Sequence, residues 1–162
     1  MPSNIGIKRQ MLKILLDNNA IDKLQQNIDF IKEYRHRLDI YVPRSVMGEA
    51  CENKSYNPTW NVISLLKADV KYLPDAVFVL GYTLLDGESC FSSDEIGEVY
   101  DNILNQNKSN IADAVIGATA VANDCILITE DKKLYNKMKK FGYKVMNFAE
   151  LQETITSLHD IN

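Results

Sequence analysis

The chain has 162 residues, 46% of them hydrophobic and 25% charged, which suits one globular domain with a sizeable core. We therefore expect a single domain over residues 1–162. The formal net charge of -4 argues against a protein that coats nucleic acid by bulk attraction, because phosphate binding needs local lysine and arginine, but it does not exclude a nuclease.

The first elements are a short strand and a helix. The apolar run Leu12 to Leu16 predicts a buried strand that ends at Asp17. A helix is expected to follow and to continue to Arg35 or His36, because apolar residues recur at three- and four-residue spacing. These apolar positions are Ile21, Leu24, Ile28 and Ile31.

Two further strands are expected from shorter apolar runs. One covers Ile40 to Val42 and is ended by Pro43, and another covers Val70 to Leu73. Between them, Ser45 can cap a helix that carries Glu49 in its first turns.

The middle of the chain gives weaker helix signals. A helical stretch is expected around Trp60 to Lys67, after a polar loop. We expect a second helix over Asp75 to Leu85, because an acid suits a first helical turn and the run is longer than most strands. Ser92 and Glu95 have capping-box spacing, which predicts a third helix over residues 93–106.

The C-terminal third gives the clearest alternation of helix and strand. Asn110 can cap the first helix of this part, and Gly142 is expected to close the second, basic helix. Helices are expected at Ile111 to Ala122, Lys132 to Phe141 and Phe148 to Ser157. Strands are expected between them, at Ile126 to Thr129 and Tyr143 to Met146. This order predicts an α/β fold, a three-layer α/β/α sandwich around a central, mainly parallel sheet.

Carboxylates follow two of the predicted strands directly. Asp17 and Asp131 should project from the same edge of the sheet, where ligands of open parallel sheets bind. Asp113 lies in a helix of small apolar residues, where a bare carboxylate would be costly to bury, so it must face a cation, a hydrogen-bonding partner or water. The alternative is that Asp113 has only a structural role, in which its negative charge interacts favourably with the helix dipole.

Glu49 is the weakest of four candidate acids, because it also suits an ordinary solvated helix. Four converging carboxylates repel one another unless a cation lies between them, and oxygen-only ligands favour Mg²⁺ or Mn²⁺. A metal-bound water can attack phosphorus, so the cluster predicts phosphodiester hydrolysis. Its catalytic and metal-binding residues are predicted to be Asp17, Glu49, Asp113 and Asp131.

Basic residues near these acids are candidates for binding a nucleic-acid backbone. Lys132 and Lys133 follow Asp131, and Arg44 precedes Glu49. The alternative is that the lysines form a solvated helix face.

Signals for secretion or a membrane are weak. The N-terminal stretch Met1 to Met11 is polar, and the longest nearly continuous apolar run is about half of the ~20 residues that a membrane helix needs. Three cysteines form no CxxC pair and suit a reducing compartment. We expect a cytoplasmic protein with no membrane role.

Three segments resemble the acidic motifs of PIN-domain nucleases, many of which are toxins of VapBC-type toxin–antitoxin pairs. They are ILLDNNAIDKL (Ile14 to Leu24), YVPRSVMGEA (Tyr41 to Ala50) and Asn110 to Val145, and they leave most of residues 54–108 unmatched. By position, the four family acids match Asp17, Glu49, Asp113 and Asp131. Asn19 and the hydroxyl of Thr129 match supporting polar positions.

The resemblance implies a PIN-like fold and a metal-dependent endoribonuclease that acts on single-stranded or structured RNA. It also implies a homodimer and an antitoxin partner that occupies the cleft. Two other hypotheses remain. A catalytically silent PIN-like module would bind RNA or serve in assembly, and a phosphotransfer enzyme or receiver domain would also use acids at strand ends, although Asn19 stands where the phosphotransferases need a second aspartate.

Overall fold

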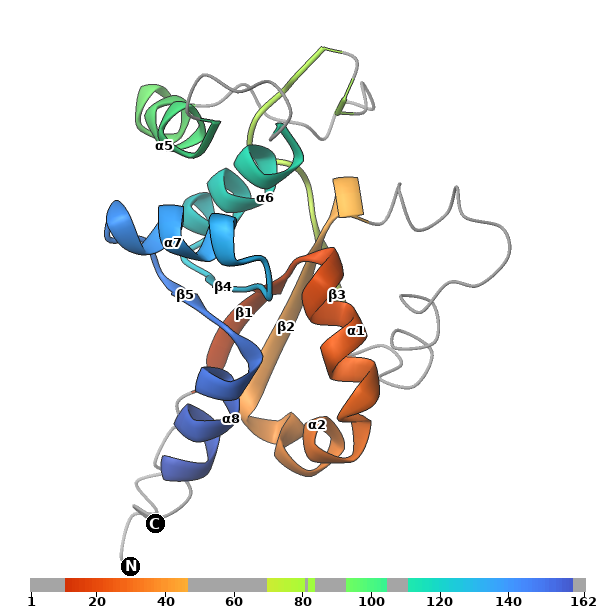
Figure 1. The fold of residues 1–162 in the computed structure, drawn as a ribbon. Helices are drawn as coiled ribbons and strands as arrows, with labels where there is room; N and C mark the ends of the chain where they lie inside the picture. Colours follow the sequence, from red (N-terminus) through yellow and green to blue (C-terminus); the bar gives the residue numbers. More distant parts are fainter. Residues whose placement is uncertain (1–10, 47–69, 81, 84–92, 105–110, 159–162) are drawn as a thin grey trace, which may run out of the picture.

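A parallel sheet forms the centre of the molecule. The computed structural model describes residues 11–46, 70–80, 82–83, 93–104 and 111–158. Within these residues, five strands pair in parallel in the order β3-β2-β1-β4-β5 (Figure 1). Their bounds are Leu12–Leu16 (β1), Leu38–Pro43 (β2), Val70–Leu73 (β3), Ile126–Ile128 (β4) and Val145–Met146 (β5). The expected parallel sheet is confirmed.

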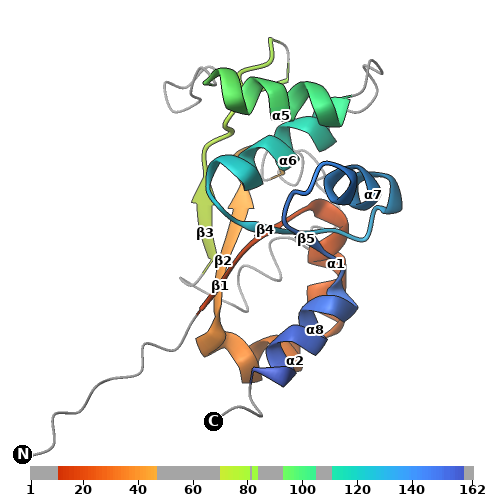
Figure 2. The same ribbon diagram turned by 90° about the vertical axis from the view of Figure 1, so that its left-hand side faces the viewer.

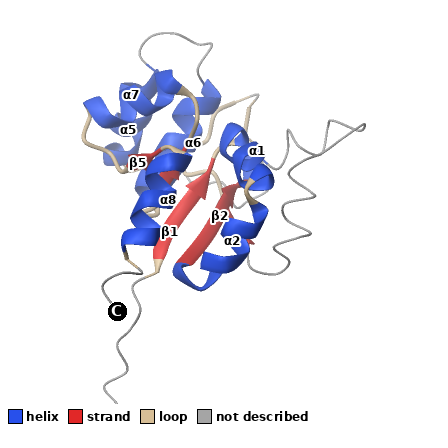
Figure 3. Cartoon of the chain, turned by 60° about the horizontal axis from the view of Figure 1, so that its bottom comes forward, coloured by secondary structure: helices blue, strands red, loops and turns tan. Residues whose placement is uncertain are grey.

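Helices cover both faces of this sheet, which gives the predicted three-layer α/β/α fold. One layer contains α1 (Asn18–Gln26), α2 (Ile28–Tyr34) and α8 (Phe148–Ser157), and the other contains α5 (Asp94–Leu104), α6 (Ile111–Ala122) and α7 (Lys132–Lys140) (Figure 2). Figure 3 looks onto the face of the sheet that α1, α2 and α8 cover, with β1 and β2 visible between α8 and the pair α1 and α2. Among the described helices, none has the length and apolar character to cross a membrane.

The direction of the chain across the sheet reverses between β1 and β4. After β1 the chain moves to β2 on one side, whereas after β4 it moves to β5 on the other side. Ligands of such sheets bind beyond the carboxyl ends of the strands at this reversal. The helices that leave these two strand ends are α1 and α7, and they begin at Asn18 and Lys132.

Helix α6 is buried between the sheet and α5 because its residues are small. Seven of its residues are buried, from Ala114 to Ala120. A Cβ atom added at Gly117 would overlap Cδ1 of Ile103 in α5 and lie 3.2 Å from Sδ of Met138 in α7. The absence of a side chain at residue 117 therefore lets three helices approach one another.

The first predicted helix is in fact two helices, α1 and α2. The break falls at Asn27, whose φ of -122° and ψ of 34° are not helical. Its side-chain Nδ2 donates to the Lys23 carbonyl oxygen, and its backbone N–H donates to the Leu24 carbonyl oxygen. Asparagine competes with helical hydrogen bonding in this way, and the apolar spacing carried no sign of it. A 3₁₀ turn (η1, Arg35–Arg37) then leads into β2.

The helix predicted over Asp75 to Leu85 is wrong at the described positions, residues 75–80 and 82–83, which form bends and turns. Asp75 does not start a helix of its own, because its Oδ1 accepts a hydrogen bond from the N–H of Ser45, 3.2 Å away. The next N–H, that of Ala76, donates to Oγ1 of Thr119 in α6. Tertiary hydrogen bonds thus replace the first turn of the expected helix.

Two capping predictions also need correction. Ser93, whose Oγ accepts from the Ile96 N–H, caps α5 in the described residues, whereas Ser92 was predicted to do so. Helical residues after β2 begin at Arg44, so Ser45 lies inside the helix and does not cap it. Several expected positions lie outside the described residues: Glu49, the stretch 60–67, Ser92, residues 105–106 and Asn110.

The order and type of the remaining strands and helices of the C-terminal third are confirmed. The bounds of α6 and α8 agree with the prediction, whereas α7 and β4 each end one residue earlier and β5 begins two residues later than expected. Gly142 closes α7 with a φ of 76°, which glycine adopts without strain.

Candidate functional site

The hydroxyl of Thr129 connects the two acids that follow the central strands. It donates a hydrogen bond to Oδ2 of Asp17 and accepts one from the Asp131 backbone N–H, 3.1 Å away. Thr129 is fully buried, and Asp17 is 5% exposed. The pairing of β1 with β4, in which Leu16 lies opposite Ile128, brings these residues together from distant parts of the chain.

The Asp17 carboxylate is also the N-cap of α1. Its Oδ1 accepts from the N–H of Asn19, 2.6 Å away. Burial raises the pKa of the Asp17 carboxyl group, the hydrogen bonds from Thr129 and Asn19 oppose this shift, and the nearby charges of Asp131 and Glu130 add to it. The carboxylate is thus held in a fixed position although burial makes its charge costly.

Asp113 lies in the first turn of α6, where it is half-buried. Burial raises the pKa of its carboxyl group, and the negative charges of Asp131 and Asp17 raise it further. The ammonium groups of Lys137 and Lys133 act in the opposite direction. Asp131 therefore lies close enough to raise the pKa of both Asp17 and Asp113, and Asp17 lies close enough to raise that of Asp113. The fourth predicted acid, Glu49, is outside the described residues.

Asp131 caps α7 and lines a surface crevice. Its Oδ1 accepts from the N–H groups of Lys133 and Leu134, at 2.7 and 3.0 Å. The crevice has a volume of about 630 Å³ and lies between the first turns of α1 and α7. Its lining residues are Asn19, Asp22, Lys23, Glu130, Asp131, Lys132 and Lys133. It thus opens where the chain direction reverses between β1 and β4.

The predicted supporting and basic residues are distributed around this crevice. Asn19, Lys132 and Lys133 line it, and both lysines are exposed. Arg44 follows the end of β2 at the same edge of the sheet but is not among the residues that line the crevice. Asn19 contacts the site in two ways, since its backbone N–H donates to Asp17 Oδ1 and the residue lines the crevice.

Sequence reasoning missed two acids at this edge of the sheet. Oε1 of Glu130 accepts from the Phe148 N–H at the start of α8, 2.8 Å away. Asp75, which is 3% exposed, follows β3 and holds the N–H of Ser45. Glu130 directly follows a predicted strand and precedes Asp131, and this position could have marked it as a candidate. The assignment of Asp75 to a helix start concealed its role.

The donor set is suited to a hard divalent cation. The acids contribute carboxylate oxygens only, and their mutual repulsion is relieved by a positive charge. Among the described residues, no group of three or more Asp, Glu, His or Cys side chains is arranged as a metal-binding site. A complete cage is not needed for Mg²⁺, which is usually held by one or two carboxylates, several waters and substrate phosphate.

Comparisons with solved structures agree with this architecture. PAE2754 from Pyrobaculum aerophilum aligns with a TM-score of 0.58 at 17% identity, over 90% of this chain and 96% of that chain. VapBC-1 from nontypeable Haemophilus influenzae aligns at 0.53 and 18% identity, over 85% and 99% of the two chains. This chain has a VapC-like PIN fold.

VapBC2 from Rickettsia felis, solved bound to a DNA fragment from its promoter, shares this VapC-like fold. It aligns with a TM-score of 0.52 at 11% identity, over 84% of this chain and 98% of that chain. Neither a sequence-family model nor a curated protein sequence matches the chain. At these identities the structural matches establish the fold, and functional assignments must come from the site.

Proposed function

We propose that this protein is a metal-dependent endoribonuclease that hydrolyses phosphodiester bonds at the acidic edge of its sheet. The observation that carries the proposal is the link from Asp17 through the Thr129 hydroxyl to the backbone of Asp131, with Asp113 in electrostatic range of both acids. Two strand-end carboxylates thus share one hydroxyl group. Both raise the pKa of a third carboxylate, that of Asp113, although Lys137 and Lys133 oppose this shift.

The acids would hold Mg²⁺ or Mn²⁺ through Asp17 and Asp113, with Asp131 and Glu49 completing the set. Such an ion supplies an acidified water and neutralises charge on a phosphate. Asp17 is the best-fixed oxygen donor, because Thr129 and Asn19 hold both of its oxygens. The hydrogen bonds that fix Asp17 are the kind of outer contacts that orient ligands at metal sites.

Lys132, Lys133 and Arg44 are proposed to bind the RNA backbone around the scissile bond. The two lysines are exposed and line the crevice that Asp131 also lines. Ammonium groups there attract phosphates locally although the chain carries a net charge of -4.

A direct test compares cleavage of a single-stranded RNA by the native protein and by Asp17→Asn and Asp113→Asn, with Mg²⁺ or Mn²⁺ present. Each substitution removes one charge and keeps the side-chain shape. We expect losses of at least about 100-fold, consistent with the removal of a catalytic group. Glu33→Gln, at an exposed acid of α2, is the matched control and should cleave like the native protein. Circular dichroism checks that every variant folds.

Three outcomes would contradict this mechanism or change its class. Cleavage that persists in both acid variants, or with excess chelator, would refute it. Metal-independent RNA binding without cleavage would indicate a catalytically silent PIN-like module instead. Preferential cleavage of single-stranded DNA would preserve the mechanism and change the substrate.

We further propose that the protein acts as the toxin of a toxin–antitoxin pair. Two VapBC structures support this role, because this fold accounts for 98% and 99% of their matched chains. An antitoxin would cover the acidic edge, and two copies of the chain would form a dimer. Induction of the native protein should arrest bacterial growth, whereas Asp17→Asn should not, and a small protein encoded beside it should restore growth. Normal growth under strong expression of active protein would refute the toxin role.

A further inference from the structure

The positive charge of the chain is concentrated directly after the acidic site. Between Asp131 and Glu150 the sequence has six lysines and no acidic residue, although the whole chain has more acids than bases. Five of these lysines lie in α7, and the sixth, Lys144, lies just before β5. A local excess of this kind is the electrostatic signature of a surface that binds a nucleic-acid backbone.

Three exposed polar residues of α7 lie on one stripe of the helix. Lys132, Asn136 and Lys139 are separated by four and three residues, which places them on the same face over two turns. Lys132 lines the crevice beside Asp131, and Lys139 lies about 10 Å further along the helix by the 1.5 Å rise per residue. The stripe therefore leads away from the acidic site.

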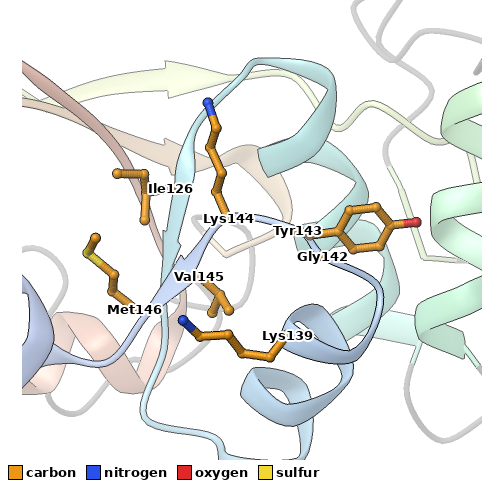
Figure 4. Close-up of a pocket in the computed structure, with 7 residues that line it drawn as sticks. All are labelled: Ile126, Lys139, Gly142, Tyr143, Lys144, Val145 and Met146. Carbon is orange, nitrogen blue, oxygen red and sulfur yellow. The ribbon is translucent and has the colours of Figure 1, made fainter.

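A second hollow, of about 400 Å³, lies at the far end of this stripe. We call it the β5 hollow. It is lined by the apolar residues Ile126, Val145 and Met146 and by Lys139 and Lys144, whose side chains lie on opposite sides of β5 in Figure 4. Figure 4 shows the Tyr143 ring pointing away from β5 towards α5, where its hydroxyl accepts from Nδ2 of Asn102. The opening is thus bordered by lysines and apolar side chains.

The lysines of the β5 hollow are available to a ligand. Nζ of Lys144 pairs with Asp124 at 2.6 Å, but these side chains are 60% and 84% exposed, so the pair is readily exchanged. Nζ of Lys139 lies over the Tyr135 ring, 5.4 Å from its centroid. Glu150 of α8 accepts hydrogen bonds from the Tyr135 hydroxyl and the Asn147 N–H. Lys139 interacts electrostatically with Glu150 and is only in part engaged by it, because these two described residues form no ion pair.

We propose that single-stranded RNA leaves the acidic site along Lys132, Asn136 and Lys139 and ends with one nucleotide in the β5 hollow. A base would pack on Ile126 and Met146, while Lys139 and Lys144 bind its flanking phosphates. This α7 track rests on the proposed nuclease function and names a substrate-binding surface outside the acidic crevice. RNA fits better than a strand from a partner protein, because β5 has only two residues to offer as a pairing edge.

The test measures RNA affinity in the Asp17→Asn background, which separates binding from cleavage. Fluorescent oligouridines of about four and about twelve nucleotides are titrated at several salt concentrations. Lys139→Ala and Lys144→Ala should each weaken binding of the longer RNA by roughly threefold to tenfold and lower the salt slope by about 0.7. Binding of the shorter RNA, centred on the acidic site, should not change.

Two controls distinguish charge from folding. Lys32→Ala removes an exposed lysine of α2 on the other helical layer and should leave both affinities unchanged. Lys139→Arg with Lys144→Arg keeps both charges and should bind the longer RNA like the parent. Unchanged affinity for the longer RNA in the two alanine variants would overturn the track.

A failure of the nuclease proposal has a different signature. If the native protein shows no metal-dependent cleavage but the lysine variants lose affinity, the nuclease assignment fails and the RNA surface remains. If the native chain does not bind RNA at all, both proposals fail. Equal loss for the shorter and longer RNAs would place both lysines at the acidic crevice and contradict a separate track.

Discussion

The Thr129 hydroxyl donates a hydrogen bond to the Asp17 carboxylate, and this contact joins residues 112 positions apart in the sequence. The same oxygen accepts the Asp131 N–H, so one buried hydroxyl fixes acids that follow two neighbouring strands. Side chains that orient ligands in this way typically affect metal affinity or activity as much as many direct ligands do.

Replacing Thr129 with valine should therefore impair both folding and cleavage. The change leaves the Asp131 N–H and one Asp17 oxygen without their partner, which should lower the free energy of unfolding by about 1–3 kcal/mol. Activity should fall by about 10- to 100-fold. Loss of the donor also raises the pKa of Asp17 further, so the acidic limb of the pH–rate profile should move to higher pH. Thr129→Ser retains the hydroxyl, so its acidic limb should lie at the same pH as that of the native protein. An acidic limb at the native pH in the valine variant would contradict the role of the hydrogen bond.

The raised pKa of Asp17 predicts how stability depends on pH without divalent ions. A carboxyl group whose pKa is higher in the folded state binds more protons there than in the unfolded chain, so stability falls as pH rises from the unfolded pKa through the folded pKa. Asp17→Asn should be more stable than the native chain at neutral pH, and this difference should shrink as pH falls towards the unfolded value. Urea unfolding across this range, with chelator present, measures it. A constant difference at all pH values would contradict the pKa shift.

Asp131 has a capping role that can be separated from its charge. Asp131→Ser keeps an acceptor for the Lys133 and Leu134 N–H groups, whereas Asp131→Ala removes it and should cost about 1 kcal/mol of stability. Both variants should lose cleavage activity, because neither supplies a carboxylate. Thermal unfolding and RNA cleavage measured on both proteins give the comparison. Full activity in the serine variant would limit Asp131 to a structural role.

Gly117 is predicted to be intolerant of a methyl group. Gly117→Ala favours a helix by about 0.5–1 kcal/mol, but the added Cβ overlaps Ile103 Cδ1, and overpacking of this kind costs about 1–3 kcal/mol. We expect a net loss of about 1 kcal/mol in urea unfolding. Adding Ile103→Val removes the overlapping atom and should recover most of the loss. If Gly117→Ala alone were as stable as the native chain, α5 would have to move away from residue 117 without cost, and this prediction would be wrong.

Local sequence patterns were sufficient for the parallel sheet and for the position of two acids after its strands. Apolar runs such as Leu12–Leu16 are buried on both faces of a parallel sheet, so they indicate strands directly, and Asp17 and Asp131 follow their ends. The patterns failed where a polar side chain serves a distant partner. Asn27 breaks a helix through its own side chain, and Asp75 holds the N–H of Ser45, 30 residues away.

The hydrogen bonds of the Thr129 hydroxyl likewise could not be predicted from local sequence. The resemblance assigned it a supporting role, but only the pairing of β1 with β4 identifies its two partners. The β5 hollow likewise depends on the packing of α7 beside β5, which no local pattern reports.

The parallel pairing of Ile14 with Ile126 has a consequence for the order of events during synthesis. A growing polypeptide that has not yet released β4 from the ribosome contains Asp17 but has neither Thr129 to hold it nor Asp131 beside it. Closing so long a loop is slow and occurs late in folding. On the proposed function, the acidic site would therefore form only near the completion of translation, and an incomplete chain would not cleave RNA.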